Sequence, residues 1–566
     1  MSLPSISDLP AAQRRIIRAW CMYDWANSAW ATSVAAILPI YFVHLFEDSL
    51  GESEVFLGIT FTGSSMWSLG VAISTGIVAF SSPVIGVIAD RAPIRKALLW
   101  AYTTIGAFFT VLAFFSAFSP EPWLWLFGVF TIANIGFAGG LVFYNSFLPH
   151  LGPRHLLDEI SSRGFAYGYA GGGLILVVHL VLILAADGTD FEDVVVRFAI
   201  ASVGVWWFGW AIWTLRVVPE PPVRSPEGGL TAASAIGIAV RELAQTFREL
   251  RRFRVVLIYL AAFLLFNDGV QTVLAIAGAY AADTLGIPLA FNMTTIAIIQ
   301  FVAVPGALAF GKLADRIATK PALIVSLLGW IVIVLFGVAL APLTPTTHED
   351  FDFQLGYRDA SGDYLVEAGP DLDDPFELRW QGEYWTLEAG AVLGAGAVAN
   401  LPEAIEETED VEYGVSIRGG ALDGQSALGP AHPALLGGGP IDWWPSLVRG
   451  LLWEPLGLGV GYQWLLLGVL VGWIIGGSQA LARSLYAQIT PERRSAEFFS
   501  FFGFISRASS VFGPTLYIVA TAVFDTRVAV TSILLIIVAG TIALRWVNVA
   551  EGARVAAEED ARTSSD

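Results

Sequence analysis

The sequence predicts an all-α integral membrane protein with twelve transmembrane helices in two six-helix halves. Hydrophobic residues make up 55% of the 566 residues and charged residues only 14%, whereas average soluble domains carry about 25% charge. Apolar runs of about 20 residues, long enough to cross a bilayer, recur along the chain. A loop motif of the first half also recurs in the second. This composition excludes a soluble enzyme, a disordered chain and a nucleic-acid binder, and it predicts the lipid bilayer as the surroundings.

The apolar runs form twelve spans, which we expect to be helical because unpaired backbone groups are costly in lipid. Their predicted ranges are 17–45, 66–89, 97–118, 123–147, 165–186, 197–217, 254–281, 291–311, 320–342, 462–486, 498–524 and 528–548. The polar start of the chain is followed by no short apolar core with a cleavage site, so we expect no cleaved signal peptide. The single cysteine, Cys21, excludes an intrachain disulfide and a multi-cysteine metal site.

Arginine and lysine gather on one side of the predicted membrane, which is typical of cytoplasmic loops. These residues are Arg14, Arg15, Arg18, Arg91, Arg95, Lys96, Arg154, Arg163, Arg241, Arg248, Arg251, Arg252, Arg254, Lys312, Arg316, Lys320, Arg493, Arg494, Arg554 and Arg562. The opposite loops carry Glu47, Asp48, Glu52, Glu54, Asp187, Asp190, Glu192 and Asp193. We therefore expect an even number of spans in the cytoplasmic (inner) membrane, with both termini in the cytoplasm.

The spans and loops define the expected domains. These are an N-terminal six-helix half (1–217), a cytoplasmic linker (218–253), helices 7–9 (254–342), an acidic extracytoplasmic insert (343–461), helices 10–12 (462–548) and a cytoplasmic tail (549–566). The linker is amphipathic and rich in Arg. We interpret it as a solvated helix, and anchoring to anionic headgroups is the alternative.

The net charge of −19 belongs almost entirely to the insert. Residues 346–445 contain 20 Asp and Glu and 3 Arg, so this segment carries −17 and the other residues −2. Apolar residues alternate from Phe351 to Val366 around a turn, and again around Gln381-Gly382, which predicts two hairpins. We expect a small, β-rich cap between helices 9 and 10. It is either a solvating insertion or a site for cations or a partner.

Two short loops, after helices 2 and 8, repeat the pattern Gly-x-x-Ala-Asp-Arg with a cation five or six residues past the Asp. The first contains Gly86, Asp90, Arg91, Arg95 and Lys96, and the second contains Gly311, Asp315, Arg316 and Lys320. The glycine permits close helix contact, and the aspartate can accept bonds from a facing helix N-terminus or from arginine. We expect both loops to act as gates on the cytoplasmic side.

The two loops resemble the signature loop of the major facilitator superfamily, which recurs in each six-helix half. The resemblance implies two halves that surround a central cavity and rock to alternate access. The first loop departs from the usual pattern at Pro93 and Ile94, and the second at Ala318 and Thr319.

A narrower resemblance covers nearly all of the chain outside the insert. It rests on the strings Tyr23-Asp24-Trp25-Ala26-Asn27-Ser28, Phe143-Tyr144-Asn145-Ser146, Ser161-Ser162-Arg163-Gly164 and Gly168-Tyr169-Ala170-Gly171, and on Gly477, Gln479, Arg483, Ser484, Glu497, Gly513 and Pro514. This set is similar to the vacuole effluxer-like branch, the family of the yeast vacuolar amino-acid exporter and many bacterial permeases. It implies export of amino acids or similar small solutes.

Ionisable groups inside the membrane are functional candidates because their burial is costly. Asp24, Asn27 and Ser28 share one face of helix 1, and Asp268, Gln271 and Thr272 repeat that spacing on helix 7. We expect both faces to line the cavity. There each aspartate would bind a substrate amine or carry a coupling proton, or else form a buried structural bond.

Further polar residues are candidates for the same cavity. Arg507 on helix 11 could bind a substrate carboxylate or pair with an aspartate of helix 1 or 7. The neutral candidates are Asn134, Asn145, Gln300 and Gln479. We interpret His179 as a core histidine, the tryptophans 25, 206, 207 and 210 as packing or interface residues, and Gly171–Gly173 as a close helix contact.

The sequence thus predicts a secondary transporter of a small molecule, with no cofactor, metal site, catalytic residue or nucleic-acid partner. Proton coupling, transport direction and oligomeric state stay open. The alternative is a membrane sensor that binds its ligand through the acidic insert.

Overall fold

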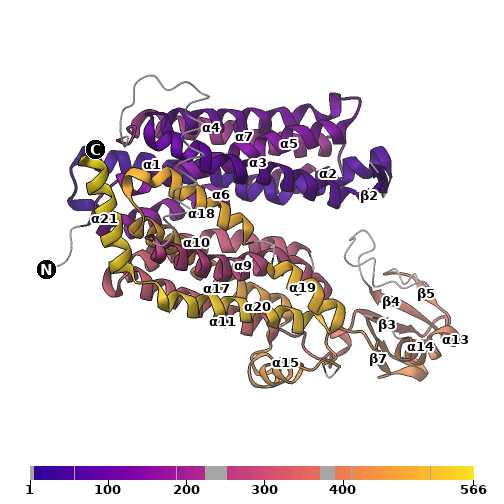
Figure 1. The fold of residues 1–566 in the computed structure, drawn as a ribbon. Coiled ribbons are helices and arrows are strands. Elements are labelled where there is room, and N and C mark those ends of the chain that lie inside the picture. The colour runs from indigo at the N-terminus through magenta and orange to yellow at the C-terminus, as the bar shows by residue number, and fades with distance from the viewer. Residues whose placement is uncertain are drawn as a thin grey trace.

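The protein is a long helical bundle that carries its β-structure at one end (Figure 1). The computed structural model describes residues 5–565 except 52, 57, 187, 223–251, 288, 370–388, 409, 410, 412, 437, 510 and 511. Most of the predicted linker and the hairpin expected around Gln381-Gly382 lie outside the described residues. Both chain ends lie at one end of the bundle, here called the termini end. The insert lies at the other, here called the insert end.

Eleven helical segments of the described chain are long and apolar enough to cross a membrane. The first consists of α1 (Ala11–Ala29) and α2 (Ala35–Leu50), which a wider π turn, η2 (Trp30–Val34), joins. The N-terminal half continues with α3 (Gly63–Arg91), α4 (Arg95–Leu112), α5 (Pro122–Ser146), α6 (Leu157–Ala186) and α7 (Glu192–Val217). The C-terminal half contains α9 (Arg254–Asp283), α10 (Leu289–Ile317), α11 (Thr319–Val338), α17 (Val460–Ile489) and α20 (Thr526–Ala543).

The predicted span 498–524 is two shorter helices, α18 (Ser495–Ala508) and α19 (Phe512–Val523). Pro514 favours the start of a new helix here, because a proline lacks the backbone N–H needed in a helix interior but is tolerated in a first turn. Asn267 of α9 contacts the end of α18, where its Nδ2 donates to Ser509 Oγ (2.5 Å). Neither helix alone reaches the length of a membrane span, which is why eleven segments qualify and not twelve.

Helix α6 approaches α1 closely because its facing positions are glycines. A Cβ at Gly164 would lie 2.6 Å from Asp24 Oδ2, one at Gly168 would lie 2.6 Å from Ser28 Oγ, and one at Gly172 would lie 3.0 Å from the Ser28 carbonyl. Any larger side chain would push the helices apart. The glycine run therefore serves helix packing and brings the polar face of α1 against α6.

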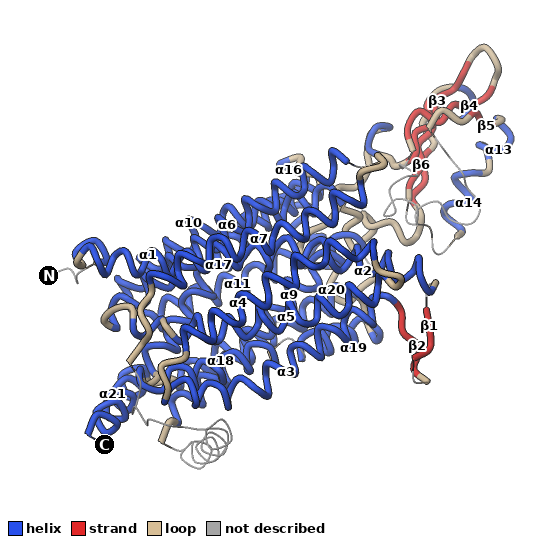
Figure 2. The backbone as a smooth tube through the Cα atoms, turned by 90° about the horizontal axis from the view of Figure 1, so that it is seen from above, coloured by secondary structure: helices blue, strands red, loops and turns tan. Residues whose placement is uncertain are grey.

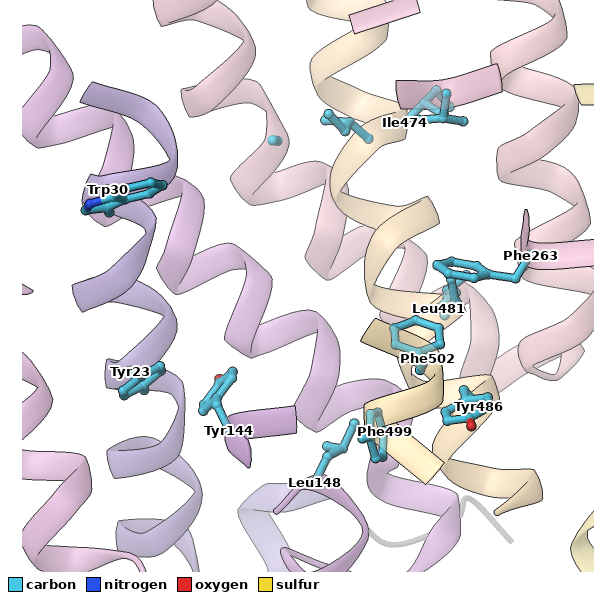
Figure 3. Packing of buried hydrophobic residues seen from close by; sticks show 14 of the residues in the cluster. Tyr23, Trp30, Tyr144, Leu148, Phe263, Ile474, Leu481, Tyr486, Phe499 and Phe502 are labelled. Carbon is cyan, nitrogen blue, oxygen red and sulfur yellow. The ribbon is translucent and has the colours of Figure 1, made fainter. Parts of the chain in front are cut away.

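Aromatic side chains fill the core on both sides of the contact between the halves (Figure 3). Tyr144 stacks on Tyr23 of α1, with ring centroids 4.7 Å apart. In the C-terminal half, Phe502 of α18 stacks on Phe263 of α9 at 4.4 Å and on Tyr486 of α17 at 4.9 Å. These stacks fix the helices that carry the polar residues described below.

The insert contains a five-stranded sheet in the order β5-β4-β3-β6-β7. Its strands are β3 (Phe353–Arg358), β4 (Asp363–Ala368), β5 (Val392–Leu393), β6 (Gly414–Arg418) and β7 (Ser426–Leu428). Strands β3 and β4 form the first expected hairpin, in which Tyr357 faces Tyr364, and β3 runs parallel to β6. The short helices α13 (Ala395–Ala399) and α14 (Leu401–Glu407) complete a hydrophobic core separate from that of the bundle. A second small hairpin, β1 (Ser53–Phe56) with β2 (Ile59–Thr62), also lies at the insert end (Figure 2).

Candidate functional site

A cavity of about 440 Å³ lies between the two halves. Helices α1, α5 and α6 line it from the N-terminal half, and α9, α10, α17 and α18 line it from the C-terminal half. Its polar lining consists of Asp24, Asn27, Ser28, Thr32, Asn145, Tyr169, Asn267, Gln271, Gln300, Ser478, Gln479, Arg483 and Ser506, and its aromatic lining of Phe137, Phe165, Phe263, Phe266 and Phe502. The cavity is therefore rich in carboxamides and phenyl rings.

The charged pair of the cavity is Asp24 with Arg483. Arg483 of α17 places Nη1 and Nη2 at 3.2 and 3.3 Å from Asp24 Oδ2, and both side chains are almost fully buried. Arg483 also donates to the Ser161 carbonyl at 2.9 Å and to Asn145 Oδ1 at 3.2 Å. Its guanidinium lies 4.2 Å from the Phe165 ring centroid. All these partners belong to the N-terminal half, so Arg483 ties one half to the other.

Two carboxamides of the cavity have unused hydrogen-bonding capacity. Asn27 Nδ2 and Gln300 Oε1 are buried and find no hydrogen-bond partner within the described part of the chain. Gln479, in contrast, accepts a hydrogen bond from the Tyr169 hydroxyl at 3.1 Å. A free donor and a free acceptor facing one cavity suit a polar ligand, because buried polar groups rarely stay unpaired.

The structure brings five of the seven predicted binding residues together and leaves two aside. Asp24, Asn27, Asn145, Gln271 and Gln479 line the cavity, and so does Gln300. Asp268 and Arg507 do not, although their neighbours Asn267 and Ser506 do. On α9 the cavity face is Phe263, Phe266, Asn267, Val270 and Gln271. Asp268 lies at the edge of this face, rotated about 100° around the helix from Asn267, and its carboxylate lies near Gly513 of α19.

The other candidates have structural surroundings. Asn134 donates to Ser74 Oγ at 2.7 Å and lies outside the cavity. His179 is buried and lies 2.8 Å from Ser202 Oγ, as expected of a core histidine. Trp25 stacks on Trp206 with ring centroids 5.6 Å apart.

Sequence reasoning missed Arg483 as a site residue. It stands within one of the strings that carried the family resemblance, but near the end of the predicted span 462–486, where an arginine is ordinary. In the structure α17 continues to Ile489, and Arg483 lies among buried residues. The available signal was an arginine within a helix that packs against a glycine-rich helix, here α6. The partner itself, 459 positions away, was not visible in the sequence.

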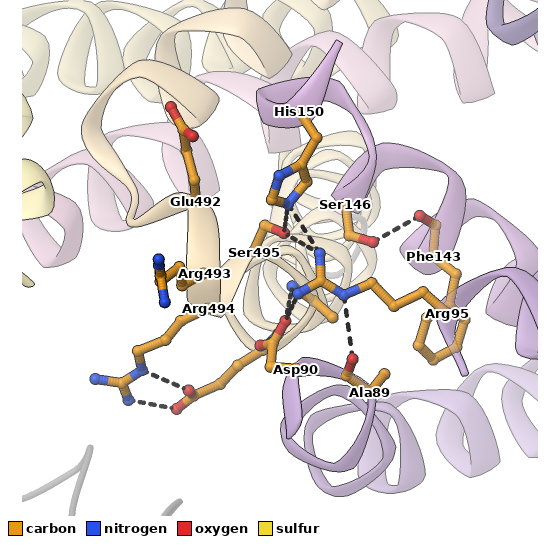
Figure 4. A network of polar contacts seen from close by, with 12 residues as sticks. Ala89, Asp90, Arg95, Phe143, Ser146, His150, Glu492, Arg493, Arg494 and Ser495 are labelled. Carbon is orange, nitrogen blue, oxygen red and sulfur yellow. Dashed lines mark hydrogen bonds and ion pairs between the residues drawn. The ribbon is translucent and has the colours of Figure 1, made fainter. Parts of the chain in front are cut away.

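The first signature loop connects the two halves through a network of polar contacts (Figure 4). Asp90 pairs with Arg95 at 2.5 Å and accepts the backbone N–H groups of Ala496 and Glu497 at 3.0 and 2.8 Å. It thereby caps the first turn of α18, where the positive end of the helix dipole favours an anion. Arg95 adds a bond to Ser495 Oγ at 2.8 Å. A Cβ at Gly86 would lie 2.8 Å from the Ala496 carbonyl, so the glycine allows the contact.

The second loop does not repeat this arrangement. Gly311 again meets the other half, since a Cβ there would lie 2.8 Å from Ser162 Cβ. Asp315, however, is exposed, and Lys320 donates to the Val547 carbonyl of its own half at 2.8 Å. The acidic residue that bridges the halves here is Asp158 of α6. It is bonded by Ser484 and accepts from Thr319 Oγ1 at 2.6 Å and from Gln488 Nε2 at 3.2 Å.

The C-terminal helix α21 (Val549–Ser565) packs across the termini end and holds the loop before α18. Arg494 forms a two-armed pair with Glu497 (2.9 Å on each arm) and reaches Glu559 at 3.2 Å. Burial alone would lower the pKa of Arg494, but these carboxylates raise it above its usual value. Asp560 accepts the backbone N–H groups of Glu492 and Arg493 at 3.0 Å each, and burial raises its pKa.

Solved structures support the major facilitator fold of the helical bundle. FucP, a fucose:proton symporter of E. coli, superposes with a TM-score of 0.54 at 10% identity, over 94% of this chain and 100% of FucP. At this identity the likeness concerns the fold alone. The bundle is a major facilitator fold, and the protein is a multi-pass membrane transporter of that superfamily and not an enzyme.

Sequence comparison names the branch. The family model described as vacuole effluxer Atg22 like matches residues 12–347 and 442–557, and the chain belongs to this family. The MFS-type transporter YxiO of Bacillus subtilis (strain 168), described as uncharacterized, is 29% identical over 329 residues, which are 56% of this chain and 72% of YxiO. Autophagy-related protein 22 of Coccidioides immitis (strain RS) is 25% identical over 413 residues, 56% of this chain and 67% of that protein. The matched ranges leave out residues 348–441, so the sheet of the insert has no counterpart in the family model.

Proposed function

We propose that the protein is a secondary transporter that moves amino acids or similar zwitterionic solutes across the cytoplasmic membrane by alternating access. One observation carries the proposal. Among the described residues that line the cavity between the halves, the one buried ion pair is Asp24 with Arg483, contributed by opposite halves. A zwitterion offers one charge to each member of this pair. Its amine would meet Asp24 and its carboxylate Arg483, while the free groups of Asn27 and Gln300 bind its polar atoms.

The same pair supports a link between binding and conformational change. Arg483 bonds only N-terminal-half residues among the contacts described above, so the halves cannot part at the termini end while it keeps them. A substrate that takes over Asp24 and Arg483 replaces these bonds and lowers the free energy needed to separate the halves. Binding energy would thereby drive the transition.

The remaining bonds between the halves favour a particular state. Those of Asp90, Arg95, Asp158 and Ser500 all lie between the cavity and the termini end. With α18 and α19 counted as one broken span, the bundle has twelve spans, and the arginine bias puts both termini in the cytoplasm. We infer from these bonds a state closed toward the termini end, in which substrate would enter the cavity from the insert side.

Transport in proteoliposomes tests the function. Purified protein should accumulate or exchange a radiolabelled amino acid, drawn from a panel ranked by substrate-dependent thermal stabilisation. Arg483→Gln should abolish both flux and stabilisation. Arg554→Gln, which alters an exposed ion pair of α21, serves as the control and should keep both. Flux in the Arg483→Gln variant equal to that of the wild type would overturn the assigned site.

Cysteine labelling tests the orientation. In a Cys21→Ser background, Ser361→Cys in the turn before β4 should react with a membrane-impermeant maleimide added to intact cells. Ser225→Cys in the linker should react only after lysis. The opposite pattern would reverse the orientation, and with it the side to which the cavity opens.

The sensor alternative can be separated by deletion. The sheet has its own core, so residues 346–432 can be replaced by a short Gly-Ser linker without opening the core of the bundle. A transporter keeps its flux after this change, whereas a sensor that binds through the insert loses its response. No flux in the wild-type protein, together with a ligand response that disappears when the insert is deleted, would favour the sensor.

A further inference from the structure

The segment between the sheet and α17 carries an apolar face that no other described part of the chain covers. It consists of α15 (Trp443–Val448), a π turn, η9 (Arg449–Trp453), and α16 (Glu454–Leu456). Trp443, Leu447 and Leu451 follow one another at intervals of four residues and are 66%, 47% and 72% exposed. Such spacing puts them on one side of a helical segment. Leu456 continues the exposed apolar surface.

Hydrogen bonds to the end of α11 fix the position of this segment along the long axis of the bundle. Trp444 Nε1 donates to the Leu335 carbonyl at 2.8 Å, within the last turn of α11. Trp453 Nε1 donates to the Ala339 carbonyl at 3.0 Å, just past that helix. Since α11 is one of the membrane-spanning helices, the segment lies at the boundary of the hydrocarbon layer and not above it.

The exposed apolar face continues a surface that already faces lipid. Leu328, Val332 and Leu335 of α11 are exposed in the structure and must contact acyl chains in a membrane. In Figures 1 and 2 the segment lies along the side of the C-terminal half near the insert end, and not beyond the end of the bundle. The two apolar surfaces therefore face the same surroundings.

The charges of the segment point inward, toward protein. Arg449 donates to the carbonyls of Pro342 and Ala434 at 3.3 and 2.7 Å. Asp442, directly before α15, is buried and lies 3.6 Å from Arg527 of α20. Of the charged side chains of α15, η9 and α16, Glu454 is exposed and Arg449 is partly buried. The adjoining sheet region is strongly acidic, whereas this face is apolar.

We propose that residues 443–456 form an interfacial anchor, whose Trp443, Leu447 and Leu451 insert into the headgroup and acyl boundary of the leaflet on the insert side. Helices of this kind bury their apolar face about 5–10 Å into that boundary, and tryptophan favours the same depth. Asp442 connects the anchor to Arg527 of α20, and Arg449 connects it to the Ala434 carbonyl in the loop after the sheet. The anchor therefore holds the sheet at a fixed position relative to the C-terminal half. The proposal depends on the bundle spanning a membrane and not on what it transports.

Site-directed spin labelling tests the anchor in the full chain. In a Cys21→Ser background, Leu447→Cys and Leu451→Cys carry a nitroxide, and the protein is reconstituted in phosphatidylcholine–phosphatidylglycerol nanodiscs. Val332→Cys on α11 is the lipid-facing control, and Val392→Cys on β5, also exposed, is the aqueous control. The ratio of collisions with oxygen to collisions with a water-soluble nickel chelate should be several-fold higher at 447 and 451 than at 392, and close to that at 332.

Two results would overturn the proposal. A collision ratio at both anchor positions equal to that at Val392→Cys would place the face in water. Protection from both reagents, with dipolar broadening between labels on different molecules, would show that a second copy of the chain covers the face. Since the labelled positions are already exposed, the labels need no repacking, and an unchanged melting temperature confirms that each variant is folded.

Discussion

Arg483 lies 3.2 Å from Asp24 although the two residues belong to opposite halves of the transporter and are both buried. A buried pair of this kind adds little net stability, because removing two charges from water costs about as much as their attraction returns. Its value lies in specificity, since it forms only when the halves meet in one arrangement. The pair is therefore suited to a protein that must alternate between two arrangements.

Removing only one member of the pair should destabilise the protein strongly. Arg483→Leu leaves the Asp24 carboxylate buried without its cation, at a cost of about 3–5 kcal/mol. Adding Asp24→Asn should recover most of the lost stability, because no unpaired charge then remains, but it should not recover transport. Melting temperatures of the single and double variants measure the coupling between the two residues. Arg554→Leu at an exposed pair is the control and should change the melting temperature little.

The two signature loops should respond differently to the same substitution. Asp90 pairs with Arg95 and caps α18, whereas Asp315 is exposed. Asp90→Asn should lower turnover by about tenfold or more, since each 1.4 kcal/mol lost from the gate changes an equilibrium tenfold. Substrate affinity should change little, because Asp90 lies outside the cavity. Asp315→Asn is the matched control, and equal losses in both variants would contradict the asymmetry.

Ala318 should be replaceable by glycine with a gain in stability. It is the non-glycine residue of the described chain with a positive φ, 69° at ψ 159°, a region used almost only by glycine. Ala318→Gly should relieve about 1–3 kcal/mol of strain against an entropic cost of about 0.5–1 kcal/mol, for a net gain of about 1 kcal/mol. Ala92→Gly in the first loop, where φ is −120°, should lower the melting temperature. A gain from both or from neither would show that φ at residue 318 is not the cause.

Hydropathy and small-residue patterns predicted much of the fold. Each apolar run of the sequence corresponds to helical structure, and eleven of the resulting helices qualify as spans. Gly86 and Gly311 both lie where the halves touch, as their motif indicated. These features depend on residues close in sequence, so a local pattern is enough to find them.

The cavity was harder to predict because it depends on helix rotation and on distant partners. The spacing of Asp268, Gln271 and Thr272 placed all three on one face, but the cavity receives Asn267 and Gln271, and Asp268 turns toward α19. Helix periodicity gives the width of a face and not the direction in which it points. Likewise Asp158, which takes the bridging part that Asp315 was expected to play, stands in no repeat. Its partners Thr319 and Gln488 come from the other half, so nothing in its local sequence marks it.

Asp24 and Asp268 should therefore differ in transport, although their sequence contexts are alike. Asp24 is the carboxylate that lines the cavity, and under the proposed function it would bind the substrate amine or a coupling proton. Asp24→Asn keeps the size of the side chain but removes the proton-binding group, so it should abolish accumulation driven by a pH gradient and leave part of the substrate exchange.

Asp268 is buried against α19 at the helix break, with Gly513 as neighbour. Asp268→Asn should lower the melting temperature and keep the coupling to the gradient. Uptake with and without an imposed pH gradient, and counterflow in its absence, measure the two properties in the same proteoliposomes. If gradient-driven accumulation survives in Asp24→Asn and fails in Asp268→Asn, the coupling site lies at the break between α18 and α19 and not in the cavity.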